Sequence, residues 1–331
     1  MTESSGRQPS STPLRLGTRG SLLAMTQSGW VADRIRAATG CPVELVEIRT
    51  TGDADQERPL SEIGGRGLFT RELDRALLDD EVDLAVHSLK DLPTRFPEGL
   101  SLGSVPVRED VRDVLIGPEG RPTGLSELPR AGRLGTSSLR RQGLALAHRS
   151  DLDVAPIRGN LDTRISKVDS GEYDAIVLAA AGVRRLGWMS RVSQSLDSAG
   201  WLPAPAQGAL GIVVRTEDLA VHESWLSALQ DHGARASVAA ERQVLHALEA
   251  GCQLPVGALA IPFGSALRLK AVVISPDGQR TVRAEASGDL NAPEELGDQV
   301  ARLLVQRGAR RILDHLDPLP NPVSGSAQEG G

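Results

Sequence analysis

Arg140 and Arg141 are the first side chains of this sequence whose type and position indicate chemistry. They follow residues 133–138, RLGTSS, which are typical of a short strand, a Gly-Thr turn and a helix opened by Ser137 or Ser138. A helix start carries unpaired N–H groups and a partial positive charge, so cations are disfavoured there. Two arginines in such a turn indicate an anionic ligand that both guanidinium groups face, although a solvated basic helix end is the alternative.

Further arginines fall at predicted strand ends and helix starts, and we expect them to converge with this pair if the sheets are parallel. The net charge of the chain is −6, so an anion site must be a local concentration of arginine and not a generally basic surface. A converged set in an acidic protein indicates a ligand with several carboxylates or phosphates. The arginines concerned are Arg15, Arg19, Arg140, Arg141, Arg158, Arg164, Arg184 and Arg185.

A carboxylate, Asp91, follows Lys90 shortly after a predicted buried strand at 82–86. It therefore belongs at the exit of that strand, in the expected cleft. Among many arginines it is either a structural counter-ion or the group that handles a cationic or N–H-bearing intermediate. The residues alone leave both interpretations open.

The two cysteines, Cys41 and Cys252, are far apart in the chain, and in a chain without a secretion signal we expect them to be reduced. Cys41 precedes Pro42 at a strand entry and is interpreted as structural. Cys252 lies just past a predicted helix end, in the accessible loop GCQLP. An inert thiol and a reactive thiol are both compatible with that position.

Several classes of protein are excluded or disfavoured by pattern. The sequence has no GxxxxGK[ST] loop, no GxGxxG fingerprint, no triad that can be recognised and no histidine spacing that suits a metal. Aromatic residues make up 2%, which disfavours stacking platforms for nucleic acid. No apolar run approaches the roughly 18 residues that span a bilayer. We therefore expect a cytoplasmic protein with no metal, nucleic-acid or membrane partner.

The elements that must position these side chains repeat one plan. The letters RLGT occur at 15–18 and at 133–136, each time followed by a serine and a predicted helix, and DLAVHS at 83–88 resembles DAIVLA at 174–179. These echoes predict two similar doubly wound α/β domains whose strand–turn–helix units face one cleft. From about residue 234 a helix, three strands and a broken helix predict a small C-terminal α+β domain.

The predicted boundaries follow from this pattern. The first domain covers 13–109 with 209–230, the second 110–205 and the third 231–317, while 1–12 and 318–331 have the composition of disordered tails. Strands are expected at 14–16, 43–48, 82–86, 113–116, 152–157, 174–179, 209–214, 257–262, 266–274 and 280–286. Helices are expected at 22–38, 68–78, 139–148, 161–168, 236–249 and 293–316 with a break at Gly308, and mobile or irregular segments at 50–67 and 93–106.

Eight blocks of the sequence resemble one enzyme family, hydroxymethylbilane synthase, also called porphobilinogen deaminase. They are GTRGSLLA, GGRGLFTRELD, DLAVHSLKDLP, GTSSLRRQ, IRGNLDTR, YDAIVLAAAGVRRLG, PAQGALGI and LEAGCQLPVGA. The resemblance runs in order from about residue 14 to 316. The resemblance implies a transferase of porphyrin biosynthesis that joins four porphobilinogen molecules head to tail, with loss of ammonia, on a covalent dipyrromethane primer. Hydrolysis then releases the linear tetrapyrrole. It also implies lobes like those of periplasmic binding proteins and a monomer.

The resemblance also implies site residues. Cys252 would carry the primer through a thioether, and Asp91 would hydrogen-bond pyrrole N–H groups and stabilise the azafulvene cation left by ammonia loss. The implied primer-binding residues are Ser88, Lys90, Thr136, Ser137, Ser138, Arg140, Arg141, Arg158 and Gly159. The implied substrate-binding residues are Arg19, Ser21, Phe69, Arg164, Arg185 and Gln207.

Two positions depart from the family pattern. Arg66 stands where GGKG is common, and Ala206 stands where the first glycine of GQG is usual. Alanine disfavours positive φ, so we expect a slightly different backbone at residue 206. A two-domain anion-binding protein would share the arginines and the echo, but it would need neither Cys252 nor a third domain. An inactive relative is a third possibility, which the retained Asp91 and Cys252 disfavour.

Overall fold

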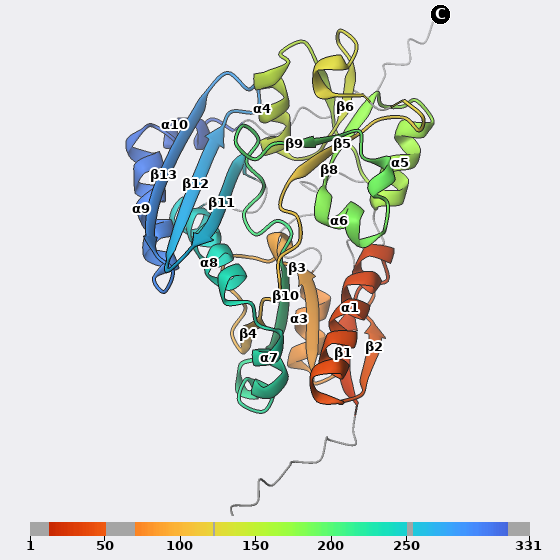
Figure 1. Cartoon of the computed structure of the whole chain (residues 1–331), viewed down its shortest axis with the longest axis vertical. Helices are drawn as coiled ribbons and strands as arrows, with labels where there is room; N and C mark the ends of the chain where they lie inside the picture. Colours follow the sequence, from red (N-terminus) through yellow and green to blue (C-terminus); the bar gives the residue numbers. More distant parts are fainter. Residues whose placement is uncertain (1–12, 51–69, 122, 250–253, 317–331) are drawn as a thin grey trace, which may run out of the picture.

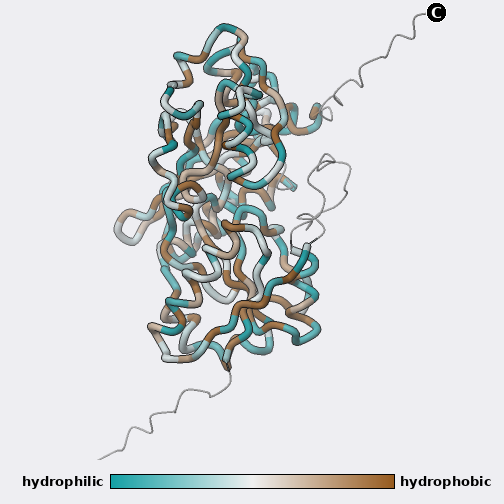
Figure 2. Tube along the Cα trace, turned by 90° about the vertical axis from the view of Figure 1, so that its right-hand side faces the viewer, coloured by the Kyte–Doolittle hydropathy of each residue, from teal (hydrophilic) through white to brown (hydrophobic). Residues whose placement is uncertain are grey.

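The computed structural model describes residues 13–50, 70–121, 123–249 and 254–316. These residues form two five-stranded sheets and one three-stranded sheet, with helices packed against them (Figure 1). In Figure 1 the first sheet lies below the second, and the Cα tube of Figure 2, turned by 90°, shows hydrophilic and hydrophobic stretches alternating along the chain. Among the helices in these ranges, none is long and apolar enough to cross a membrane.

The first sheet has the strand order β2-β1-β3-β10-β4. Strands β1, β2 and β3 are parallel, whereas β10 runs antiparallel to both β3 and β4. Its apolar side chains pack on one face against α1 and α7 and on the other against α3. The elements are β1 (Leu14–Thr18), α1 (Leu22–Thr39), β2 (Val43–Glu47), α3 (Arg71–Leu78), β3 (Leu84–Ser88), β4 (Leu100–Ser104), β10 (Leu210–Arg215) and α7 (Glu223–Leu229).

The second sheet has the same plan in the order β7-β6-β8-β5-β9. Three parallel strands are again followed by one antiparallel strand, β5, which pairs with β8 and β9. The elements are β5 (Asp113–Ile116), β6 (Arg133–Gly135), α4 (Leu139–His148), β7 (Asp153–Ala155), α5 (Leu161–Asp169), β8 (Ala175–Ala179), α6 (Ala180–Arg185) and β9 (Gln194–Leu196). The shared plan confirms the predicted pair of similar α/β domains, although each sheet is mixed and not fully parallel.

The third unit is an antiparallel sheet, β11-β12-β13, covered on one face by helices. Its other face contributes Leu259, Val272 and Ile274 to the core of the second domain. The elements are α8 (His232–Ala247), β11 (Val256–Phe263), β12 (Ala266–Ile274), β13 (Thr281–Asp289), α9 (Pro293–Gln306) and α10 (Arg310–Leu313). This unit is the predicted C-terminal α+β domain.

The chain crosses twice between the first two sheets, and the two crossing segments lie side by side. The Glu109 N–H donates to the Gly208 carbonyl at 3.2 Å, and Arg108 Nε donates to the Gln207 carbonyl at 2.9 Å. Gly208 has a φ of 88°, and a Cβ there would overlap the Glu109 carbonyl oxygen, so glycine is required. Ala206 adopts a φ of 63° in spite of its side chain, so a left-handed backbone is present at this departure from the family pattern.

Local signals predicted the starts of two helices and the bounds of two strands, but α8 begins at His232, four residues before its predicted start. Ser21 and Ser138, and not Ser137, cap α1 and α4, and β5 and β12 have their predicted bounds. Strand β4 lies inside the segment expected to be irregular, and β9 and α7 were not predicted. Cys41 is a buried free thiol, consistent with a structural role. The loop expected at 50–67 lies almost entirely outside the described residues.

Candidate active site

A cleft of about 330 Å³ lies between the two α/β domains. The first domain contributes the start of α1 and the turn after β3, and the second contributes the starts of α5 and α6. These two helix starts follow parallel strands, β7 and β8, so the cleft lies at the carboxyl ends of the strands, as expected. The start of α1 also approaches α6, because a Cβ at Gly182 would lie 3.5 Å from Leu23 Cδ2.

Positive charge dominates the walls of this cleft. Two carboxylates, Asp91 and Asp162, accompany the cations there. The cations are Arg19, Lys90, Arg141, Arg158, Arg164 and Arg185. Such an excess in a partly desolvated space favours a ligand with several negative groups.

Several of these cations are buried, and burial disfavours their charged forms. It lowers the pKa of Lys90 to about 8, even though the neighbouring Asp91 charge raises it. Burial, together with the charges of Arg141 and Arg158, lowers the pKa of Arg164 to about 10, and burial lowers that of Arg185 to about 10. Bound carboxylates would offset this cost, because an opposite charge stabilises the cationic form.

Asp91 is the last residue of a single 3-10 turn, Leu89–Asp91, that follows β3 directly. Leu89 is fully buried and its N–H donates to the Ala209 carbonyl at 3.0 Å, whereas Asp91 is exposed and lines the cleft. The buried leucine thus anchors the turn, and the carboxylate is presented to the ligand side.

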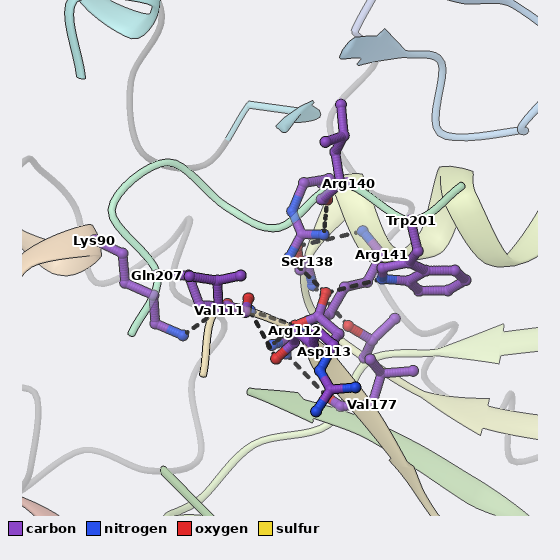
Figure 3. Close-up of polar contacts among 12 residues, drawn as sticks. Lys90, Val111, Arg112, Asp113, Ser138, Arg140, Arg141, Val177, Trp201 and Gln207 are labelled. Carbon is purple, nitrogen blue, oxygen red and sulfur yellow. Dashed lines mark hydrogen bonds and ion pairs between the residues drawn. The ribbon is translucent and has the colours of Figure 1, made fainter. Parts of the chain in front are cut away.

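Arg140 and Arg141 are both buried, and they share one carboxylate that sequence reasoning missed (Figure 3). Arg141 Nη2 lies 2.7 Å from Asp113 Oδ1, and Arg140 Nη2 lies 2.9 Å from Asp113 Oδ2. Trp201 Nε1 also donates to Asp113 Oδ2 at 2.8 Å. Burial raises the pKa of Asp113, but the two guanidinium charges outweigh it and hold that pKa well below its usual range. The counter-ion of the arginine pair is therefore internal, and two cations still face one anion.

Ten of the predicted site residues line the cleft, and the others do not or cannot be placed. Those that line it are Arg19, Ser21, Ser88, Lys90, Asp91, Arg141, Arg158, Gly159, Arg164 and Arg185. Thr136, Ser137, Ser138, Arg140 and Gln207 are described but are not among the lining residues. Cys252 and Phe69, like Arg66, lie outside the described residues. The roles predicted for all of these residues stay predictions.

The expected convergence of arginines was wrong for Arg15 and Arg184. Arg15 lies near the amino end of β1, away from the cleft, and its Nη2 pairs with Asp83 at 2.7 Å and Asp80 at 2.8 Å. Arg184 Nε lies 3.2 Å from Glu109 Oε1 on a crossing segment. Both arginines belong to motifs next to the cleft. Arg15 is at the wrong end of its strand, and Arg184 is on a side of its helix that pairs with Glu109.

Apolar side chains form a second part of the wall that charge-based reasoning missed. Leu22 is 58% exposed where it lines the cleft, and Trp188 lines it from the turn after α6. Other apolar residues of the wall are Leu23, Leu161, Leu178 and Leu186. An exposed leucine and an aromatic ring in the wall of one cleft suit flat apolar ring systems between the charged groups. Among the described residues, no group of His, Cys, Asp and Glu could hold a metal ion.

Family models match almost the whole folded part of the chain. Residues 14–223 match the dipyromethane cofactor binding domain of porphobilinogen deaminase, and residues 236–306 match the C-terminal domain of the same enzyme. The chain belongs to the porphobilinogen deaminase family. The match to a C-terminal domain also removes the alternative of a two-domain anion-binding protein.

Curated relatives agree over nearly their full length. The chain is 46% identical over 304 residues to the porphobilinogen deaminase of Syntrophobacter fumaroxidans, covering 92% of this chain and 97% of the relative. It is 51% identical over 300 residues to that of Desulforudis audaxviator, covering 90% and 96%. The family predicted from the sequence is confirmed, and so are the transferase activity of a porphobilinogen deaminase, a step of tetrapyrrole biosynthesis, and the dipyrromethane cofactor.

The described side chains fit such a cofactor. A porphobilinogen deaminase cofactor made of pyrrole rings offers carboxylate arms and N–H groups, and this cleft offers an excess of cations, two carboxylates and apolar side chains. The lowered pKa of Lys90 also fits an anionic ligand, because the hydrogen-bond partner of this ammonium within the described part of the chain, Gln207 Oε1 at 3.4 Å, is neutral.

Proposed function

We propose that this chain makes hydroxymethylbilane from porphobilinogen with Asp91 as its catalytic residue and Cys252 as the attachment point of dipyrromethane. The observation that carries the proposal is the exposed Asp91 carboxylate in a cleft whose charged lining residues are mainly cations. Bound dipyrromethane supplies the primer to which porphobilinogen units are added.

The cations bind the carboxylate arms. Each porphobilinogen has an acetate and a propionate, so a growing chain requires many positive partners. Arg141, Arg164 and Arg185 are buried enough for their charges to act at a low effective dielectric, where a charge-assisted hydrogen bond is strong. Leu22 and Trp188 contact the ring faces and exclude water from them.

Asp91 acts on the ring nitrogen. As ammonia leaves the aminomethyl group of porphobilinogen, positive charge spreads over the pyrrole ring and its N–H. A fixed carboxylate that accepts this N–H stabilises the developing charge more than the neutral substrate, which is the requirement for catalysis. The surrounding cations bind the acetate and propionate groups and so keep the pyrrole N–H next to the Asp91 carboxylate.

The domain boundaries 13–109 with 209–230, 110–205 and 231–317 are also proposed. Support comes from β10 (Leu210–Arg215), which returns to the first sheet after the second has been completed. A monomer in the cytoplasm, with porphobilinogen and the growing polypyrrole as its small-molecule partners, completes the proposal.

Replacement of the two cleft carboxylates tests the role of Asp91. Asp91→Asn should lower kcat by about 100- to 1000-fold, as loss of one preorganised electrostatic partner does, while Asp162→Asn should retain most activity. Circular dichroism and intact mass establish that both variants are folded and carry the primer. Normal turnover by Asp91→Asn would reject the role of Asp91.

Intact mass tests the attachment point. The active protein should exceed the polypeptide mass by that of dipyrromethane, and Cys252→Ser should have the bare mass. Cys41→Ser is the matched control, since Cys41 is a buried thiol in the first domain and should leave the adduct in place. An adduct that persists in Cys252→Ser would refute the tether.

A further inference from the structure

Arg242 is a buried arginine of α8, in the third domain, whose guanidinium contacts the first domain. Nη1 donates to the carbonyls of Leu89 at 3.4 Å and Leu92 at 3.2 Å, and Nη2 donates to the Pro93 carbonyl at 2.6 Å. All three acceptors belong to residues 89–93, which carry Asp91 and are called the Asp91 turn below.

Within the described residues, no carboxylate forms an ion pair with Arg242. The ring of Phe96 lies beside its guanidinium, with 5.5 Å between Cζ and the ring centroid. Burial lowers the pKa of Arg242 to about 10, and no anion of the described residues offsets that effect. The described partners of this buried guanidinium are backbone carbonyls and one aromatic ring. Its hydrogen bonds therefore stabilise the conformation of that backbone.

The Asp91 turn needs an external support because its own hydrogen bonding is weak. It is a three-residue 3-10 turn, and its Leu92 N–H donates to the Leu89 carbonyl at 3.3 Å, beyond the usual range. Buried Leu89 and Leu92 hold the turn on its apolar side. Arg242 donates at normal distances to the carbonyls of Leu92 and Pro93, with the Leu89 carbonyl at the outer limit, and so fixes the rotation of the turn about that apolar anchor.

Neighbouring residues of α8 make different interdomain contacts. Glu241 accepts from Arg108 Nη1 at 2.7 Å and from the Ala206 N–H at 2.6 Å, and so holds both crossing segments. Arg235 Nη1 donates to the Leu102 and Gly103 carbonyls of β4 at 3.1 and 3.4 Å. Arg235 thus makes the same kind of contact as Arg242, but away from the Asp91 turn, and offers a matched control.

We propose that Arg242 is a positioning residue of the reaction, which holds the Asp91 turn so that the Asp91 carboxylate is aimed into the cleft. The proposal rests on the catalytic role proposed for Asp91. Arg242 is not among the residues that line the cleft, so it acts through the turn and not on the substrate. Because α8 ends at Ala247, shortly before Cys252, one helix then links the catalytic carboxylate to the segment that carries the primer.

Steady-state kinetics on loaded enzyme tests the proposal with Arg242→Gln, Arg242→Lys and Arg235→Gln. Arg242→Gln should lower kcat by up to about 100-fold with little change in KM, because a small misplacement of a catalytic group costs rate and not binding. Arg242→Lys should recover part of that loss, since an ammonium still donates to the carbonyls. Arg235→Gln should keep the kcat of the wild type. Amide hydrogen exchange should accelerate at residues 89–92 in Arg242→Gln and not in Arg235→Gln.

Three results would overturn the proposal: unchanged kcat in Arg242→Gln, equal losses of kcat in Arg242→Gln and Arg235→Gln, or a loss of kcat with unchanged amide exchange at residues 89–92. If Arg242→Gln does not fold or load primer, Arg242→Lys decides by the same kinetic and exchange measurements. These results can be distinguished from a failure of the catalytic role proposed for Asp91. That failure would appear as normal turnover by Asp91→Asn, whatever the Arg242 variants do.

Discussion

Lys90 and Asp113 belong to different domains, and a single side chain, Gln207, bridges them. Lys90 Nζ donates to Gln207 Oε1 at 3.4 Å, and Gln207 Nε2 donates to Asp113 Oδ1 at 2.8 Å (Figure 3). Asp113 also pairs with Arg140 and Arg141, so two guanidinium groups contact one carboxylate directly and the Lys90 ammonium reaches it through Gln207. This surplus of positive charge attracts anions from the cleft side, because buried charges are weakly screened.

Asp113→Asn should destabilise the protein by about 3–5 kcal/mol, because it leaves two buried arginines without their anion. The folded pKa of Asp113 lies below the unfolded value of about 3.9, so its stabilisation is complete above that pH and is lost as the pH falls below it. Urea unfolding should show a gap between wild type and variant at pH 7 that narrows in acid. Asp153→Asn, at an exposed pair with Arg133, should cost about 1 kcal/mol or less. A gap that does not change in acid would contradict the assignment.

Arg141→Gln and Arg140→Gln should separate ligand binding from structural support. Arg141 lines the cleft, so its loss leaves a ligand carboxylate unpaired and should raise KM by about 10- to 100-fold. Arg140 donates to the Leu202 carbonyl at 2.7 Å and pairs with Asp113, so its loss should mainly lower the urea midpoint. Equal rises of KM in both variants would mean that Arg140 contacts the ligand as well.

The contrast between these arginines and Asp113 shows where sequence reasoning stops. The pair was placed correctly in the first turn of a helix because Ser138 gives a local capping signal. Its partner could not be found, because Asp113 reaches the pair only through the antiparallel insertion of β5 beside β8 and the packing of α4. No periodicity in one segment encodes that contact.

Other correct and incorrect predictions from the sequence also depend on whether a signal is local or arises from tertiary contacts. The βα units and the cleft were predictable because strand, turn and cap signals are local and the domains repeat them. Strand β4 was missed because Gly103 and the nearby prolines imitate a loop, whereas pairing with β10 stabilises it. Arg242 gave no signal, since a helical arginine that binds carbonyls of another domain has the pattern of an ordinary surface residue.

Lys90→Arg should change the pH dependence of catalysis. The charged ammonium binds carboxylates, so binding weakens as the pH rises through the Lys90 pKa, which is about 8 before bound carboxylates raise it. We expect a descending limb of kcat/KM at pH 8 or above in the wild type. In Lys90→Arg the limb should move to higher pH, because the guanidinium stays charged. Lys167→Arg, at an exposed pair with Glu172, is the control and should leave the profile unchanged. Identical limbs in wild type and Lys90→Arg would assign the ionisation to another group.

Ala206→Gly should be nearly neutral, although replacing a buried alanine with glycine normally destabilises a protein. Ala206 has a φ of 63°, and a left-handed backbone costs a non-glycine residue roughly 1–2 kcal/mol, which glycine would relieve. Against this stand the lost burial of a methyl group, about 0.8 kcal/mol, and the larger unfolded-state entropy, about 0.4–1 kcal/mol. These effects nearly cancel, so urea unfolding should place the variant within about 0.5 kcal/mol of the wild type.

Ala209→Gly is the matched control for that measurement. Ala209 belongs to the same apolar cluster and is equally buried, but its φ is not positive, so glycine relieves no strain there. It should lose about 1–2 kcal/mol from the methyl group and the entropy together. Equal losses at both positions would mean that the Ala206 backbone is not strained, because only relief of strain distinguishes the two substitutions. The difference between the variants therefore measures the cost of the left-handed alanine beside the crossing segments.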